Sequence, residues 1–158
     1  MAGSIESGIQ FLRYKMDKVE FSTNHSLRLL EDSVSDFSCE YQFGIPDAIC
    51  YEMENDYIYV VPLLTKMTMF PKDDKTQILA QGEFQITGLF TSNRLLDKEV
   101  EEKLIKVRGP AILFPFMRAN VSNILMNTGF AQIEMPLVDV GEMSKQSKNK
   151  IVHIPLKS

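Results

Sequence analysis

The stretch Asp56–Phe90, DYIYVVPLLTKMTMFPKDDKTQILAQGEFQITGLF, is the part of the sequence that indicates the fold class most directly. Its second half, Gln77–Phe90, alternates with a period of two, which is typical of a strand with one buried face. The side chains expected on that buried face are Ile78, Ala80, Gly82, Phe84 and Ile86. The first half, Asp56–Phe70, is apolar on both faces, and Pro71–Lys75 supplies turn residues. We therefore predict an antiparallel hairpin. Pro62 lacks a backbone donor, so its strand is expected to lie at an edge there or to carry a bulge.

Further elements are predicted on both sides of this hairpin. Two strands are expected upstream, at Gly8–Ser22 and Phe37–Glu54, and the second runs into a tight turn at Glu52–Asp56. Downstream the pattern becomes helical, first at Asp97–Lys106 and then at Ala111–Thr128. Strands followed by helices indicate an α+β fold. We expect a four-stranded antiparallel sheet, followed by a short helix and one long helix packed on one face.

The expected long helix is unusual, because it carries uncharged polar residues opposite its apolar side. These are Asn120, Asn123 and Asn127, with Arg118 and Ser122 nearby. Such a composition is typical of a helix covered on both sides, for example by another subunit. A core helix with a few solvated asparagines fits the pattern equally well. Pro110 is expected in the first turn, and Gly129 is expected to end the helix in the left-handed conformation.

The composition of the chain limits the classes of function. A chain of 158 residues with 44% apolar residues is expected to form a single domain, residues 1–158, with a core of its own. The net charge of -4 and the dispersed basic residues argue against binding to nucleic acid or to anionic lipid. The first residues do not resemble a signal peptide, and no apolar run is long enough to cross a bilayer. We therefore expect a soluble, cytoplasmic protein without membrane insertion.

Motifs for catalysis or metal binding do not occur in the sequence. The two cysteines, Cys39 and Cys50, and the two histidines, His25 and His153, have no metal-binding spacing. P-loop, dinucleotide-binding, nucleophile-elbow and zinc-protease motifs are also missing. Both cysteines fall inside an expected strand, so buried and unreactive thiols are the better interpretation. We expect no enzyme activity, no cofactor and no metal site.

Two features point instead toward contact with apolar partners. The chain has nine methionines and ten phenylalanines, and flexible thioethers and large rings suit a surface that accepts varied apolar shapes. Ordinary core packing would explain them as well. The long connection Thr23–Asp36 carries Leu27, Leu29 and Leu30. Connections of this length are often functional, although these leucines would also fit simple docking onto the core.

A resemblance to a known family rests on the stretch Pro110–Val140, PAILFPFMRANVSNILMNTGFAQIEMPLVDV. It closely resembles the signature of the SecB family of export chaperones. That signature is an I-L-F-P-aromatic-x-R helix, a glycine and phenylalanine, a short glutamine-hydrophobic segment and a proline-valine close. Gln81–Leu89 looks like the family's glycine-x-phenylalanine strand, and Tyr14–Phe21 is similar to its first strand. The resemblance covers about residues 8–140.

The resemblance implies both a function and an assembly. It implies an ATP-independent holdase that binds unfolded or export-bound polypeptides in apolar grooves. It also implies a homotetramer, a dimer of dimers with the long helices between the sheets. Together with the loop leucines and the apolar strand and helix faces, it gives the residues expected to contact a client, which are Leu27, Leu29, Leu30, Phe37, Tyr41, Phe43, Phe114, Phe116 and Met117. The residues expected at the oligomer interface are Tyr14, Arg118, Asn120, Ser122, Asn123 and Asn127.

The chain departs from the family pattern after the proline-valine close. A basic linker and a β-like segment, Ile151–Leu156, replace the usual lid helix and acidic tail, so residues 141–158 form a divergent extension of the 8–140 core. The segment Lys150–Leu156 is expected to add a strand to a sheet edge or to occupy the groove. The acidic face that the family offers to the motor SecA is represented only by Asp17 and Glu20. Contact with SecA is therefore a weaker expectation.

Two hypotheses from different classes remain at this point. The first is a SecB-like chaperone that serves several clients or one dedicated client, such as an antitoxin. The second is a SecB-fold adaptor that has lost client binding, which the missing lid helix would permit.

Overall fold

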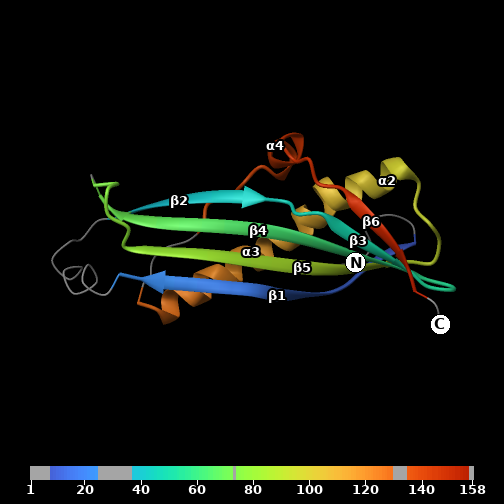
Figure 1. Ribbon diagram of the computed structural model, residues 1–158, viewed down its shortest axis with the longest axis horizontal. Helices are drawn as coiled ribbons and strands as arrows, with labels where there is room; N and C mark the ends of the chain where they lie inside the picture. Colours follow the sequence, from blue (N-terminus) through green and yellow to red (C-terminus); the bar gives the residue numbers. More distant parts are fainter. Residues whose placement is uncertain (1–7, 25–36, 73, 130–134, 157–158) are drawn as a thin grey trace.

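The structure of the protein is a computed structural model. It describes residues 8–24, 37–72, 74–129 and 135–156. One sheet forms the body of the molecule, and a long helix crosses behind it (Figure 1). The strands are β1 (Ile9–Thr23), β2 (Phe37–Gly44), β3 (Ala48–Glu52), β4 (Tyr57–Pro71), β5 (Ala80–Ser92) and β6 (Ile151–Pro155). The helices are α2 (Lys98–Lys103), η2 (Leu104–Arg108), α3 (Gly109–Asn127) and α4 (Val140–Lys145). The α+β class predicted from the sequence is confirmed, with α3 as the long helix.

The sheet has six strands in the described part of the chain, so the expectation of four strands was wrong. The order is β1-β5-β4-β3-β6, and β2 also pairs with β4. One missing strand comes from the segment predicted as Phe37–Glu54, which divides into β2 and β3 around Ile45–Asp47. Pro46 lies in that gap, and its missing backbone donor explains why a single strand does not continue through it. The other is β6, which pairs with β3 in parallel.

The irregularity expected at Pro62 is found in the neighbouring strands. Gly44 lies opposite Leu64 and Ile49 opposite Val60, so one extra residue sits on the β2–β3 side. Pro62 faces this interruption, while its own strand pairs continuously with β5. The long strand β4 is therefore an interior strand, and Pro62 lies opposite the point where its pairing passes from β2 to β3.

The core lies between the sheet and α3. Alternate residues of β4 and β5 face the helix, and paired residues such as Leu63 and Ile86 are fully buried. The helix contributes a stripe at intervals of four residues, which comprises Leu113, Met117, Val121 and Leu125. Gly88 permits the close approach, because a Cβ there would lie 2.7 Å from Leu113. The alternation predicted for β5 is confirmed from Ala80 onward, whereas Ile78 precedes the strand and is 43% exposed.

The helical half of the chain is more continuous than the sequence indicated. The helices α2, η2 and α3 follow one another without a gap, and Gly109 has helical backbone angles rather than breaking the chain. Gly109 is instead a packing position, since a Cβ there would lie 2.7 Å from the Leu104 carbonyl oxygen and 2.9 Å from Val61. Pro110 lies in the first turn of α3, as predicted. Gly129 has φ of 99°, which confirms the predicted left-handed end.

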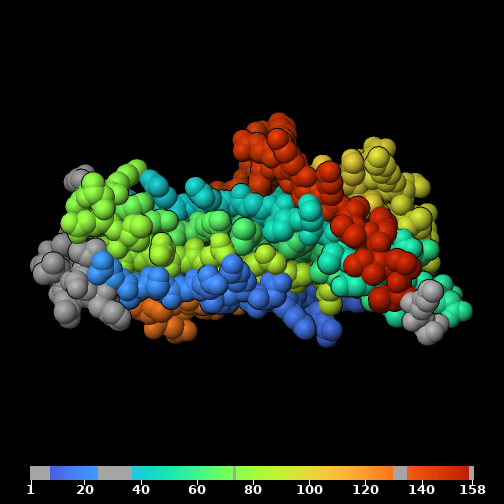
Figure 2. Space-filling model, viewed as in Figure 1, coloured from blue at the N-terminus to red at the C-terminus, as the bar shows by residue number. Residues whose placement is uncertain are grey.

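The C-terminal extension folds back onto the sheet. The short helix α4 begins after Asp139, whose side chain accepts a hydrogen bond from the Glu142 backbone N at 3.2 Å. The chain then reaches β6, which lies at the edge of the sheet beside β3 (Figures 1 and 2). The expectation that Lys150–Leu156 adds a strand to a sheet edge is confirmed, because Ile151–Pro155 forms β6 beside β3.

Candidate polypeptide-binding surface

Three aromatic side chains from the edge strand β2 and from α3 pack against one another. Tyr41 and Phe43 are two residues apart, so both point toward the helix side of the sheet. Their ring planes are nearly parallel, with centroids 6.2 Å apart. The Phe43 ring then meets the Phe114 ring edge-on, with centroids 5.7 Å apart and an interplanar angle of 61°. We call Tyr41, Phe43 and Phe114 the aromatic cluster.

The surroundings of the aromatic cluster are apolar, with two buried hydroxyl groups. In the described part of the chain, Tyr41 Oη and Thr65 Oγ1 are buried side-chain atoms without a hydrogen-bond partner. Burial raises the pKa of Tyr41 well above its ordinary value, and it also raises the pKa of Cys39 beside it. Such surroundings suit contact with apolar side chains.

The structure divides the residues expected to contact a client into separate groups. Phe116 lies on the β1 side of α3, where its ring stacks on Tyr14 at 4.5 Å and approaches Phe11 at 6.1 Å. Met117 is fully buried beneath the helix. Phe37 is half-buried at the start of β2. The loop leucines, Leu27, Leu29 and Leu30, lie outside the described residues.

A segment after α3 contributes an apolar residue that the sequence analysis did not identify. Arg118 Nε donates a 2.6 Å hydrogen bond to the Met135 carbonyl oxygen, and the Met135 side chain is fully buried. Two residues further along, Leu137 is 80% exposed. A large apolar side chain so exposed in an anchored segment is a candidate contact for a partner. The sequence offered only its place two residues after Met135, with Pro136 between them, as a signal.

The residues expected at an oligomer interface also separate into two groups. Asn120 Nδ2 donates to the Phe116 carbonyl oxygen at 2.8 Å and lies 3.4 Å from Tyr14 Oη, so these residues have partners within the chain. Arg118 anchors Met135 in the same way. The others lie on the outward side of α3: Ser122 and Asn123 line a shallow hollow of about 320 Å³, and Asn127 is exposed.

The opposite face of the sheet carries a network of paired charges. Asp17 Oδ2 accepts hydrogen bonds from Thr87 Oγ1 at 2.8 Å and from Gln85 Nε2 at 3.2 Å. Glu20 lies 3.9 Å from Lys18 Nζ. Both acidic residues expected to face SecA are thus exposed and already have partners.

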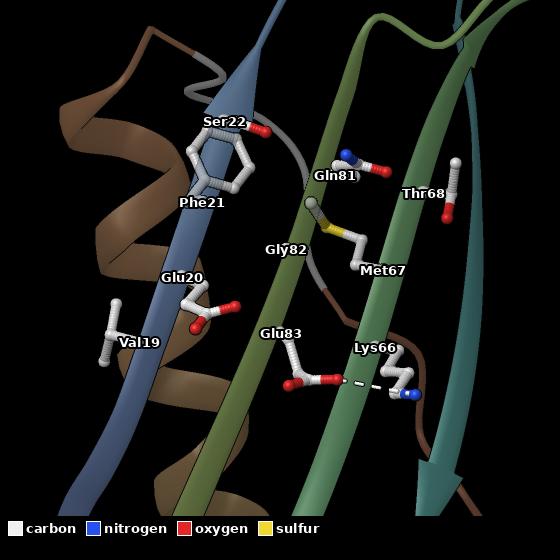
Figure 3. A pocket seen from close by; sticks show the side chains of 10 residues that line it. All are labelled: Val19, Glu20, Phe21, Ser22, Lys66, Met67, Thr68, Gln81, Gly82 and Glu83. Atoms are coloured by element: carbon white, nitrogen blue, oxygen red, sulfur yellow. Dashed lines mark ion pairs between the residues drawn. The ribbon is translucent and has the colours of Figure 1, made fainter.

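A wide hollow of about 640 Å³ adjoins this network, between β1, β5 and β4 (Figure 3). Glu83 lines it from β5, the middle of the three strands, and pairs with Lys18 and, at 3.4 Å, with Lys66. The hydrogen bond from Lys18 lowers the pKa of Glu83 and raises the pKa of Lys18 itself. The hollow is polar and charge-balanced, unlike the surface around the aromatic cluster.

The expectation of buried cysteines is confirmed for Cys50, whereas Cys39 is only half-buried. Cys50 is fully buried, and burial raises its pKa to about 11. A thiol with such a pKa stays protonated at neutral pH and is a poor nucleophile.

Within the described ranges, no group of three or more His, Cys, Asp and Glu side chains is arranged to hold a metal ion. No helix in those ranges is long and apolar enough to cross a membrane.

These features define an α+β domain with an aromatic surface between an edge strand and a long helix. The chain belongs to the SecB family of chaperones, because the family model described as preprotein translocase subunit SecB matches residues 47–150. This family consists of chaperones and not of enzymes, which confirms the expectation of a non-enzymatic protein.

A solved structure of a SecB-like chaperone has a similar fold. The Mycobacterium tuberculosis Rv1957 SecB-like chaperone, in complex with a ChAD peptide from the Rv1956 HigA1 antitoxin, superposes with a TM-score of 0.63 and 12% identity. The match covers 84% of this chain and 92% of that one. A protein of unknown function from Streptococcus agalactiae matches with a TM-score of 0.43 and 9% identity, over 83% of this chain and 97% of that one. No curated protein shows significant similarity to the chain.

Proposed function

We propose that this protein is an ATP-independent holdase, which binds extended apolar segments of unfolded polypeptides over the aromatic cluster. The observation that carries the proposal is the contact of Phe43 on the edge strand with Phe114 on α3: Phe114 is buried at 5% exposure, and the half-buried Phe43 ring rests on it and presents apolar area. Family membership supports it, since SecB-family proteins are chaperones. A holdase shifts an equilibrium by binding the unfolded state, so it needs no catalytic group.

The test is light scattering of a chemically unfolded protein that aggregates on dilution, with and without this protein and without ATP. We expect suppression by the wild type and a several-fold loss of suppression in Phe43→Ser. The matched control is Leu12→Ser, which removes an apolar side chain that is 53% exposed on β1. Circular dichroism of each variant separates loss of binding from loss of fold. Equal suppression by Phe43→Ser and the wild type would contradict the assignment of the site.

The proposal includes a homotetramer in the cytoplasm, built as a dimer of dimers through the outward side of α3. Support comes from the uncharged polar surface there, which includes Ser122, Asn123 and Asn127. Such a surface suits a hydrated interface between subunits. Multi-angle light scattering should give a mass near four times 18.0 kDa. Asn123→Arg should lower that mass, because two like charges would meet across the interface.

A dedicated partner is the second candidate, and one observation favours it. The Mycobacterium tuberculosis relative was solved with a peptide from an antitoxin, which is a single defined partner. If this protein serves one partner, affinity capture from its native cell should return one dominant protein, and unrelated unfolded proteins should still aggregate. If the protein is an adaptor that does not bind clients, the Phe43→Ser variant should capture the same partner as the wild type.

A role in export would add handover to SecA at the acidic residues of the sheet face. Support is limited to the exposed positions of Asp17 and Glu20, and both carboxylates already have partners. Binding of purified SecA should weaken in the Asp17→Asn, Glu20→Gln double variant if this face is used. Unchanged binding would place the contact elsewhere.

A further inference from the structure

The outer edge of β1 is poorly suited to bind a further strand. This strand carries an extra residue at two points, because its register against β5 shifts between Phe11 and Arg13 and again between Met16 and Lys18. Such bulges bend an edge and interrupt its row of backbone donors and acceptors. The strand also carries basic side chains of the kind that protect edges from pairing, which are Arg13, Lys15 and Lys18.

The edge beside β3 is already occupied by a strand of the same chain. The C-terminal strand β6 pairs with β3 in parallel, and a backbone hydrogen bond of 2.8 Å joins Ala48 N to the Lys150 carbonyl oxygen. A side chain adds to this attachment, since His153 Nε2 lies 3.1 Å from Glu101 Oε1 on α2. The protein thus uses strand addition at this half of its sheet edge.

The edge of β2 continues the same line, because β2 and β3 both pair antiparallel with β4 and lie end to end along it (Figure 1). All eight residues of β2 pair with β4 in continuous register, and the strand, FSCEYQFG, contains no proline or lysine. Its one charged side chain, Glu40, is paired with Lys75 Nζ at 2.7 Å. Every residue of β2 keeps some exposure. Within the described ranges, residues 38–44 pair with no strand other than β4, so this edge has a regular row of backbone donors and acceptors.

The side chains of β2 alternate in a way that matches an extended partner. The residues on the helix side are apolar, and two of them belong to the aromatic cluster: Cys39, Tyr41 and Phe43. The residues on the outward side are polar: Ser38, Glu40 and Gln42. An added strand would extend both rows, because facing residues of neighbouring strands lie on the same side about 5 Å apart. A segment with apolar residues at every second position would thus place them beside Tyr41 and Phe43.

We propose that a client binds in extended form, as a further strand along residues 38–44 of β2, with its apolar side chains beside the aromatic cluster. This inference rests on the proposed holdase function and specifies what that site recognises. Backbone hydrogen bonds are the same for every sequence, so they give affinity without selecting one client. The aromatic cluster then selects segments with apolar residues at alternate positions. Segments with proline inside the paired stretch are excluded, because proline lacks the backbone donor.

The test compares three versions of one fluorescein-labelled peptide in anisotropy titrations with the full chain. The parent peptide has about ten residues, with valine and threonine alternating and lysine at both ends. Successive backbone N–H groups of a strand point to opposite neighbours, so N-methylation of every second residue blocks pairing on one side only. One version is methylated at the valines and the other at the threonines, while their side chains are identical. We expect one version to bind as the parent does and the other to bind at least roughly tenfold more weakly.

Hydrogen exchange followed by mass spectrometry locates the added strand. We expect the bound parent peptide to slow exchange in residues 38–44 several-fold and to leave exchange in β1 unchanged. Unchanged exchange in β2 with the peptide bound would overturn the inference.

The outcome for the inference is separate from the outcome for the holdase function. Equal binding of the two methylated versions would overturn strand addition, and suppressed aggregation in light scattering would leave the holdase function standing. If aggregation is not suppressed and the parent peptide does not bind, the holdase function and strand addition both fail.

Discussion

The Phe43 ring on β2 meets the Phe114 ring on α3 edge-on, with centroids 5.7 Å apart. This contact joins the edge strand β2 to α3, the helix that covers one face of the sheet. An edge strand has one side free for a further chain, and an aromatic pair beside it offers apolar area with a defined geometry. The relationship between these two residues is therefore the basis of the functional proposal.

Gly109 is predicted to be a position where any side chain destabilises the fold. A Cβ there would lie 2.7 Å from the Leu104 carbonyl oxygen, and backbone at that point cannot give way easily. We expect Gly109→Ala to lower the free energy of unfolding by about 1–3 kcal/mol, measured by urea denaturation. Gly44→Ala is the control, since no atom lies within 4 Å of its added Cβ, and it should change stability by less. Equal effects of the two variants would contradict the packing at the start of α3.

Arg118 is predicted to hold the segment that carries Leu137. Its Nε bonds the Met135 carbonyl oxygen at 2.6 Å, and hydrogen bonds that involve a charged group contribute roughly 1.5–3 kcal/mol. Arg118→Ala should lower the free energy of unfolding by about that amount and increase hydrogen exchange of residues 135–139. Arg118→Lys should not restore it, because an ammonium group does not reproduce the planar Nε–H. Full rescue by lysine would show that only the charge matters.

Glu83 is predicted to contribute to the loss of stability in acid. Its hydrogen bond from Lys18 lowers its pKa in the folded protein below the ordinary 4.5. A lowered folded pKa gives stability that is present above the unfolded pKa and is lost as the pH falls through the folded pKa. Between about pH 5 and about pH 3, Glu83→Gln should therefore lose less stability than the wild type. The group is exposed, so the difference should be small. An identical acid profile in thermal melts would contradict this reading.

The two cysteines are predicted to differ in their reaction with a maleimide. Cys50 is fully buried with a pKa of about 11, so only local unfolding should expose its thiolate. Cys39 is half-buried on β2, so it should react at least tenfold faster at about pH 7.5. Peptide mass spectrometry over time measures both rates in the same sample. Faster labelling of Cys50 would contradict the burial described for β3.

The sequence predicted the fold class because its most strongly patterned segments became β4, β5 and α3. In β5 and α3 the burial of one face determines the pattern, as in the α3 stripe that contains Leu113 and Met117, whereas the β4 segment was recognised as a long run that is apolar on both faces. The division of β2 from β3 was missed, because Pro46 was read as part of a single strand. Pro46 was a local signal for the boundary, whereas the one-residue offset against β4 is a relation between distant segments that the local sequence does not show.

The candidate site was predicted in part. The apolar faces of the expected strand and helix pointed to Tyr41, Phe43 and Phe114, and these three side chains do pack together. The same reasoning grouped Phe116 with them, but two residues along a helix is about half a turn, and Phe116 packs over β1 instead. The bridge of His153 to Glu101 joins residues 52 positions apart, so no spacing rule could have found it.

The measurement that tests the central claim most directly is maleimide labelling of Cys39 while an unfolded client is bound. Cys39 lies on the same face of β2 as the aromatic cluster, and Cys50 serves as an internal control in the same molecule. A bound client should slow labelling of Cys39 several-fold and leave the rate at Cys50 unchanged. The reference sample contains the same client protein in its folded state. If a client binds, as seen by suppressed aggregation, and the Cys39 rate does not change, the binding site does not lie between β2 and α3.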